Sequence, residues 1–164
     1  MGSAGYNLSV LLHIVCVIVA YGALTIDWLS VSHQQRFHGA EAYAVAQVRY
    51  TTTIKVATRF LYGVPVFGVF AVLLSKGDIS LAEAWISAAL GVWIVTIAVL
   101  HGMVVPARRQ MLLLLGELAG RSDDAMSRLT SRLGTATQKA ARGQALISLL
   151  TVVALVLMIW KPGH

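Results

Sequence analysis

Hydrophobic residues are concentrated in four nearly continuous apolar runs, at about residues 8–31, 52–75, 81–105 and 144–160. A helix needs about 20 such residues to cross about 30 Å of hydrocarbon, and each run has about that length. The runs lack the alternation of barrel strands, and backbone polar groups in lipid must be satisfied within a helix or a closed barrel. The pattern therefore predicts an all-α polytopic membrane protein, a four-transmembrane-helix bundle that forms one domain over residues 1–164.

The segment 106–143 is the one polar stretch long enough to form structure outside the bilayer. The apolar run Met111–Leu115 is too short to span, so we expect it to lie in the interface or to extend the third helix. After the candidate N-cap Ser122, apolar residues recur at helical spacing at Met126, Leu129 and Leu133. This spacing predicts a cytoplasmic amphipathic helix that continues into the fourth span.

Composition and charge place the chain in a membrane and orient it there. Hydrophobic residues make up 57% of the chain and charged residues only 12%, against about a quarter in soluble domains, which excludes an ordinary soluble enzyme. All but two of the 13 Lys and Arg residues lie in or next to the segments 32–51 and 106–143; the exceptions are Lys76 and Lys161. Basic loops stay in the cytoplasm, so we expect a bacterial inner-membrane protein with both termini outside. No motif indicates nucleic acid, and the lipid bilayer is the expected partner.

Asp27 is an acidic residue inside the first predicted span, where a lone charge is costly. The second span brings Lys55 and Arg59 in from the same side of the membrane. We therefore predict a structural ion pair between Asp27 and Arg59 or Lys55. The functional alternative is a proton or ligand site that uses this pair.

Histidines are the natural candidates for binding a metal or a haem, and their depths sort them into two groups. His13 lies near the outer end of the first span with Cys16 one turn later, an incomplete copper site that supplies an imidazole and a soft sulfur. His101 lies roughly 20 Å deeper, so the two histidines cannot share a ligand. Near the inner face His101 can meet His33 or His38, which would allow bis-histidine ligation of haem b.

Three short segments carry a resemblance to known membrane proteins: "LLHIVCVIVAYG" in the first span, "HGMVVPARRQM" at the end of the third and "ALVLMIWKPG" at the end of the fourth. With these segments the chain resembles a bacterial family of predicted integral membrane proteins of unknown function. It is similar in layout to copper-resistance protein D-type membrane domains and to four-helix protoporphyrinogen oxidases. The resemblance implies a four-helix bundle, suggests His13 as a ligand or proton-handling residue, and makes copper or haem handling an expectation.

Two function hypotheses follow. The sequence contains no nucleophile triad, zinc-protease helix, phosphate loop or carboxylate pair. We therefore favour a non-enzymatic accessory or interaction subunit that packs against copies of itself or against another membrane protein. The alternative is a haem- or copper-handling membrane protein with redox activity. The first hypothesis predicts a colourless, metal-free preparation, and the second predicts a bound chromophore or a stoichiometric metal.

Overall fold

The computed structural model describes residues 4–34, 39–75, 79–118 and 126–161, and the regular structure in these ranges is entirely helical. The elements in chain order are α1 (Ala4–Gln34), α2 (Gly39–Arg49), the π-helical η1 (Tyr50–Ile54), α3 (Lys55–Leu73), α4 (Ala84–Val99), the π-helical η2 (Leu100–Val104), α5 (Val105–Leu118) and α6 (Met126–Trp160). Since α2, η1 and α3 follow one another directly, as do α4, η2 and α5, the eight elements form four long helices.

These four helices are long and apolar enough to cross a membrane. The protein is therefore an all-α four-helix membrane bundle, as predicted. The fourth helix continues from the polar segment into the apolar run without a break, and α5 extends the third helix through Met111–Leu115. The second and third helices continue beyond the predicted limits at residues 52 and 105. A helix of 35 residues is about 50 Å long, so about 20 Å of the second, third and fourth helices, each 35 residues long, is more than the hydrocarbon requires.

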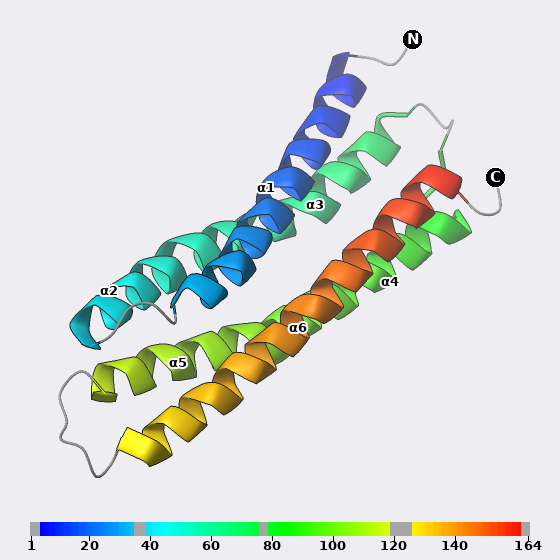
Figure 1. Ribbon diagram of the computed structural model, residues 1–164. Helices are drawn as coiled ribbons and strands as arrows, with labels where there is room; N and C mark the ends of the chain where they lie inside the picture. The colour runs from blue at the N-terminus through cyan, green and yellow to red at the C-terminus, as the bar shows by residue number, and fades with distance from the viewer. Residues whose placement is uncertain (1–3, 35–38, 76–78, 119–125, 162–164) are drawn as a thin grey trace.

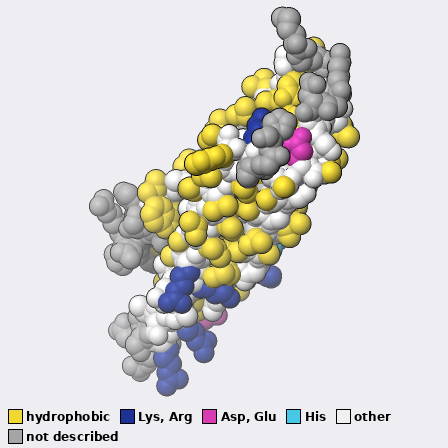
Figure 2. Space-filling view, turned by 90° about the vertical axis from the view of Figure 1, so that its right-hand side faces the viewer, with side chains coloured by type: hydrophobic (Ala, Val, Ile, Leu, Met, Phe, Trp, Pro, Cys, Tyr) yellow, Lys and Arg dark blue, Asp and Glu magenta, His cyan; other side chains and the backbone are white. Residues whose placement is uncertain are grey.

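Figure 1 shows α1 beside α3 and α6 beside α4, with the two chain termini at the same end. We call this end, where α1 starts, α3 ends, α4 starts and α6 ends, the terminal end. The opposite end, formed by α2, α5 and the start of α6, we call the basic end. On the face shown in Figure 2, Lys and Arg side chains gather towards the basic end, below a broad apolar belt.

The bundle core lies midway between the two ends. It contains one fully buried large apolar side chain from each of the four helices: Leu24, Leu61, Leu100 and Ile147. Many other large apolar side chains face outward, such as Ile18 and Ile159, which are 65% and 82% exposed. Exposure of this extent on every helix is the pattern of a protein whose outer surface is covered by lipid.

Both π-helical segments lie at the level where the core meets the basic end. Their residues Ile54, Leu100 and Val104 are buried. Gly143 of α6 packs directly on η2, because a Cβ at that position would lie 2.9 Å from Cγ2 of Val104. The π-helical turn and the missing side chain together let α6 approach the third helix closely at this level.

Candidate functional site

The sequence Gly63–Gly68 of α3 forms a docking surface for α1. A Cβ on Gly63 would lie 2.8 Å from Sγ of Cys16, and a Cβ on Gly68 would lie 3.2 Å from Nδ1 of His13. Two side chains of α1 thus rest against the backbone of α3 at positions where α3 has no side chain. The residues that approach α3 at these two glycines both come from α1.

Pro65 attaches the third helix to the same stretch of α3. Proline has no N–H, so it leaves the carbonyl of residue i−4 without its helical donor, and here that residue is Leu61. The indole Nε1 of Trp93 in α4 donates a hydrogen bond of 2.9 Å to this carbonyl. Trp93 is therefore a packing and hydrogen-bonding residue, and its polar atom is already paired.

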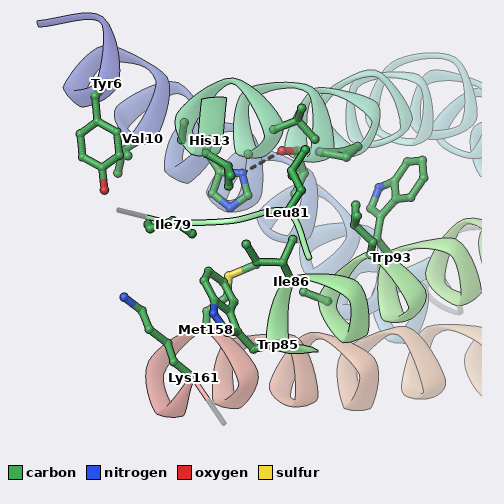
Figure 3. A pocket seen from close by; sticks show the side chains of 18 residues that line it. Tyr6, Val10, His13, Ile79, Leu81, Trp85, Ile86, Trp93, Met158 and Lys161 are labelled. Carbon is green, nitrogen blue, oxygen red and sulfur yellow. Dashed lines mark hydrogen bonds between the residues drawn. The ribbon is translucent and has the colours of Figure 1, made fainter. Parts of the chain in front are cut away.

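His13 makes a hydrogen bond that places a proton on one nitrogen of its ring. Its Nδ1 lies 2.8 Å from the carbonyl oxygen of Val64. A carbonyl can only accept, so Nδ1 carries the proton and donates. In the neutral form of the ring, Nε2 then has a lone pair that can accept a hydrogen bond. Figure 3 shows this second nitrogen pointing away from α3 into a cavity, towards the side on which Met158 lies.

This terminal cavity has a volume of about 250 Å³ and lies between α1, α3, α4 and α6. Its walls are mainly apolar, with Val10, Ile86 and Leu90 among them, while Tyr6, His13 and Lys161 bring polar groups to it. Ligand pockets are commonly about 300–1,000 Å³, mostly apolar, with a few placed polar groups. The terminal cavity has this character at the small end of the range.

Lys161 lies at one side of the terminal cavity and is held there by the end of α6. Its φ of 40° places it in the left-handed region, where it ends the helix, and its N–H donates to the carbonyl of Leu157. Its Nζ lies 5.7 Å from the centre of the Trp85 ring, within range of a cation–π interaction. The indole N–H of Trp85 is bonded to Glu83, so the ring presents mainly its apolar face.

The structure does not bring His13 and Cys16 together as a ligand pair. They contact α3 at Gly68 and Gly63, which are about 7.5 Å apart along the helix, and Cys16 is buried at 5% exposure. No group of three or more His, Cys, Asp or Glu that could hold a metal ion occurs in the described part of the chain.

At the basic end, Asp27 forms an ion pair with a different partner from the one predicted. Nη2 of Arg108 donates to Oδ2 of Asp27 at 2.5 Å, and the two residues are 8% and 3% exposed. Lys55 and Arg59 are both exposed. The prediction that Asp27 pairs with Arg59 or Lys55 was therefore wrong.

Depth along the helices explains this correction. Asp27 lies about 35 Å from the start of α1, Arg108 about 35 Å from the start of α4, and Arg49 about 35 Å from the end of α3. Lys55 and Arg59 lie about 9 and 15 Å nearer the terminal end than Arg49 does. On the side of the basic end, the predicted second span reached only residue 52 and the predicted third span only residue 105. Arg49 and Arg108, the two arginines at the depth of Asp27, were therefore assigned to loops.

The predicted haem pair cannot be assembled from the described residues. His101 is exposed, its Nδ1 lies 3.1 Å from the carbonyl of Ile97 in its own helix, and its ring centre is 6.2 Å from that of Tyr62. It therefore lies on the outer surface of the bundle rather than in its interior. The side chain of His33 and all of His38 lie outside the described part of the structure. No second described imidazole lies at the level of His101.

Comparison with known proteins finds no relative of this chain. No family model matches the chain, and neither a curated protein nor a solved structure is significantly similar to it. The candidate site therefore depends on geometry alone. Of its polar groups, His13 was the one proposed as a ligand-binding residue from the sequence. Tyr6 lies seven residues before His13 on α1, whereas Met158 and Lys161 come from the end of the chain, and packing brings these two to the same cavity.

Proposed function

We propose that the protein is a non-enzymatic membrane protein whose terminal cavity binds a small, largely apolar molecule, and that it acts as an accessory subunit to a membrane-protein partner or to further copies of itself. The observation that carries the proposal is the free Nε2 of His13 directed into an apolar cavity of about 250 Å³. A fixed hydrogen-bond acceptor in an apolar pocket selects a ligand that is mostly apolar and carries one hydrogen-bond donor.

In this proposal the protein lies in a bacterial inner membrane with both termini outside. The support is the distribution of Lys and Arg, which gather at the basic end (Figure 2), together with the rule that basic segments stay in the cytoplasm. The terminal cavity then opens near the outer leaflet, where a membrane-soluble molecule reaches it from the lipid or from the outer aqueous phase.

The ligand chemistry follows from two polar residues of the cavity and from its aromatic rings. Nε2 of His13 accepts one hydrogen bond, the ammonium of Lys161 favours an oxygen-bearing or anionic group, and the rings of Trp85 and Trp93 favour a flat apolar body. A small phenol has these properties, with one O–H donor on an apolar ring.

Binding of 4-bromophenol to the detergent-solubilised protein tests this proposal. Its bromine quenches tryptophan fluorescence, and bromobenzene is the matched probe without the donor. We expect saturable quenching, with 4-bromophenol about fivefold tighter than bromobenzene because one hydrogen bond is worth about 1 kcal/mol. His13→Ala should remove this preference, and His101→Ala should keep it. Quenching that does not saturate, or a preference that survives in His13→Ala, would contradict the proposal.

A second candidate function is binding of copper(I), favoured by one specific observation. The thioether of Met158 lines the same cavity as the free nitrogen of His13, and the other ring nitrogen of His13 is bonded to a carbonyl, as in most metal-ligating histidines. An imidazole and a thioether suit copper(I).

Titration with copper(I) against a chromogenic chelator separates the two candidates. Copper binding predicts that His13→Ala and Met158→Leu each weaken the affinity at least tenfold, whereas Cys16→Ser leaves it unchanged. Equal copper(I) affinities in the native protein and in all three variants would rule out this site.

A further inference from the structure

Four polar or basic side chains lie together on the outer surface where α3 meets the third long helix. Lys55, Arg59 and Tyr62 of α3 follow one another at spacings of four and three residues, so they lie on one face of the helix. Lys55 and Arg59 are exposed, and Tyr62 is 44% exposed. The ring centre of Tyr62 lies 6.2 Å from that of the exposed His101 in η2. We call these four residues the lipid-facing patch.

The lipid-facing patch lies at the depth where the hydrocarbon meets the lipid headgroups. Trp85 and Trp160, at the start of α4 and the end of α6, are placed as interfacial anchors of the terminal end. Lys55 and Arg59 lie about 27 and 21 Å from the end of α3, and His101 about 25 Å from the start of α4. Since the hydrocarbon is about 30 Å thick, the long side chains of Lys and Arg reach headgroups at its other boundary.

The two cations of the lipid-facing patch are not neutralised within the described part of the chain. Lys55 and Arg59 make no hydrogen bond or ion pair with any described residue. Asp27 is the described acidic residue nearest to them in depth, and it is buried and paired with Arg108. The other described acidic residues lie near the two ends of the bundle: Glu41, Glu83 and Glu117. A cation that faces lipid without an opposite charge is costly, so the patch favours an anion, and phosphate is the anion that a bilayer provides at this depth.

We propose that the lipid-facing patch binds one anionic phospholipid of the leaflet at the basic end, in which Lys55 and Arg59 pair with the phosphate. The hydroxyl of Tyr62 is a further donor, without an acceptor among the described residues. The rings of Tyr62 and His101 offer an amphipathic surface to the glycerol region of the lipid. A zwitterionic phospholipid carries the same phosphate, but its own ammonium neutralises it. The two cations therefore select a lipid of net negative charge.

Native mass spectrometry of the whole protein in a neutral detergent tests the proposal, because each bound lipid adds a known mass. Phosphatidylglycerol and phosphatidylethanolamine with the same acyl chains are the two probes. Each Lys or Arg near an anionic membrane surface strengthens binding about fivefold, so the first phosphatidylglycerol should bind about 25-fold more tightly than the first phosphatidylethanolamine. Lys55→Gln and Arg59→Gln should each reduce this preference to about fivefold, and the double variant should abolish it.

Arg142→Gln is the matched control. Arg142 is exposed at the same depth, about 27 Å from the end of α6, but it lies on a helix that contributes nothing to the patch. This variant and the charge-conserving Arg59→Lys should both keep the preference for phosphatidylglycerol. An equal loss in Arg142→Gln and Arg59→Gln would mean that the basic surface attracts lipid without a site, and the proposal would be wrong.

Two further outcomes would overturn the proposal. The first is equal binding of the two lipids by the native protein. The second is a lipid-free dimer that Lys55→Gln and Arg59→Gln dissociate, because the patch would then be an interface between two copies of the chain.

Discussion

The two ends of the bundle bury their polar groups in opposite ways. At the terminal end, His13 and Trp93 donate to carbonyls of α3, so neutral side chains are held by the backbone of a neighbouring helix. At the basic end, Asp27 and Arg108 pair as ions between α1 and α5. The first arrangement leaves a cavity of about 250 Å³ beside it and the second a cavity of about 20 Å³.

This difference separates two tasks within one fold. A carbonyl acceptor is fixed by its helix, so a side chain bonded to it needs no second charge and can leave its other atoms for a ligand. A buried ion pair requires two helices in matched depth, and each charge depends on the other. We infer that the basic end fixes the register of the helices and that the terminal end is the part able to accept a guest molecule.

The largest expected effect concerns the ion pair. Arg108→Gln and Asp27→Asn each leave one buried charge without its partner, and each should lower the free energy of unfolding by about 3–5 kcal/mol. The double variant should lose less than the sum of the single variants, because it leaves neither charge unpaired. Equilibrium unfolding in mixed detergent and SDS micelles measures all three. Arg59→Gln is the control and should change stability by less than about 0.5 kcal/mol. A loss as large as that of Arg108→Gln would instead support the pairing of Asp27 with Arg59 that the sequence predicted.

The next effect concerns the contact of Cys16 with Gly63. Gly63→Ala places a Cβ 2.8 Å from Sγ of Cys16, and overpacking of this kind costs about 1–3 kcal/mol. Cys16→Ala in the same protein removes the obstructing sulfur and should recover most of the loss. The same unfolding assay compares the two single variants with the double variant. No recovery in the double variant would show that Gly63 is needed for a reason other than the contact with Cys16.

An effect of similar size is expected from Trp93, whose indole donates to the carbonyl that Pro65 leaves without a donor. Trp93→Phe should cost about 1–3 kcal/mol, since the carbonyl of Leu61 becomes unsatisfied. In the Pro65→Ala background residue 65 has its own N–H to donate to Leu61, so the same substitution should cost clearly less. Equal costs in both backgrounds would mean that the indole contributes packing alone.

The fold could be predicted because the length of an apolar run is a direct physical requirement of the bilayer. The helical spacing of Leu129 and Leu133 likewise allowed the continuity of α6 to be predicted, and α6 is one helix from Met126 to Trp160. The limits of the other helices could not be predicted as well. Helices α2 and α5 are polar enough to resemble loops, although they continue the helices of their neighbours.

The predicted helix limits decided which of the three charged residues at the basic end, Asp27, Arg49 and Arg108, could be found from the sequence. Asp27 was identified because it is an acidic residue well inside an apolar run. Arg49 and Arg108 were not, because both lie beyond the predicted spans. The depths agree only when they are counted from the observed helix ends, which place both arginines at the level of Asp27. The terminal cavity had no comparable signal, since the depth of Met158 and Lys161 does not determine their position around the bundle.

The smallest expected effect is at Lys161, where two opposing terms can be separated. A non-glycine residue in the left-handed region costs about 1–2 kcal/mol, and Lys161 has a φ of 40°. Its ammonium regains part of that cost through the ring of Trp85, by about 0.5–1 kcal/mol for an exposed pair. Lys161→Ala loses the cation–π interaction and keeps the backbone strain, whereas Lys161→Gly loses both. Lys161→Gly should therefore be about 1 kcal/mol more stable than Lys161→Ala in the same unfolding assay.

In the fluorescence titration both variants should bind 4-bromophenol more weakly than the native protein, because both lack the ammonium at the terminal cavity. Native-like binding by either variant would restrict the recognition of the ligand's polar group to His13 and Tyr6.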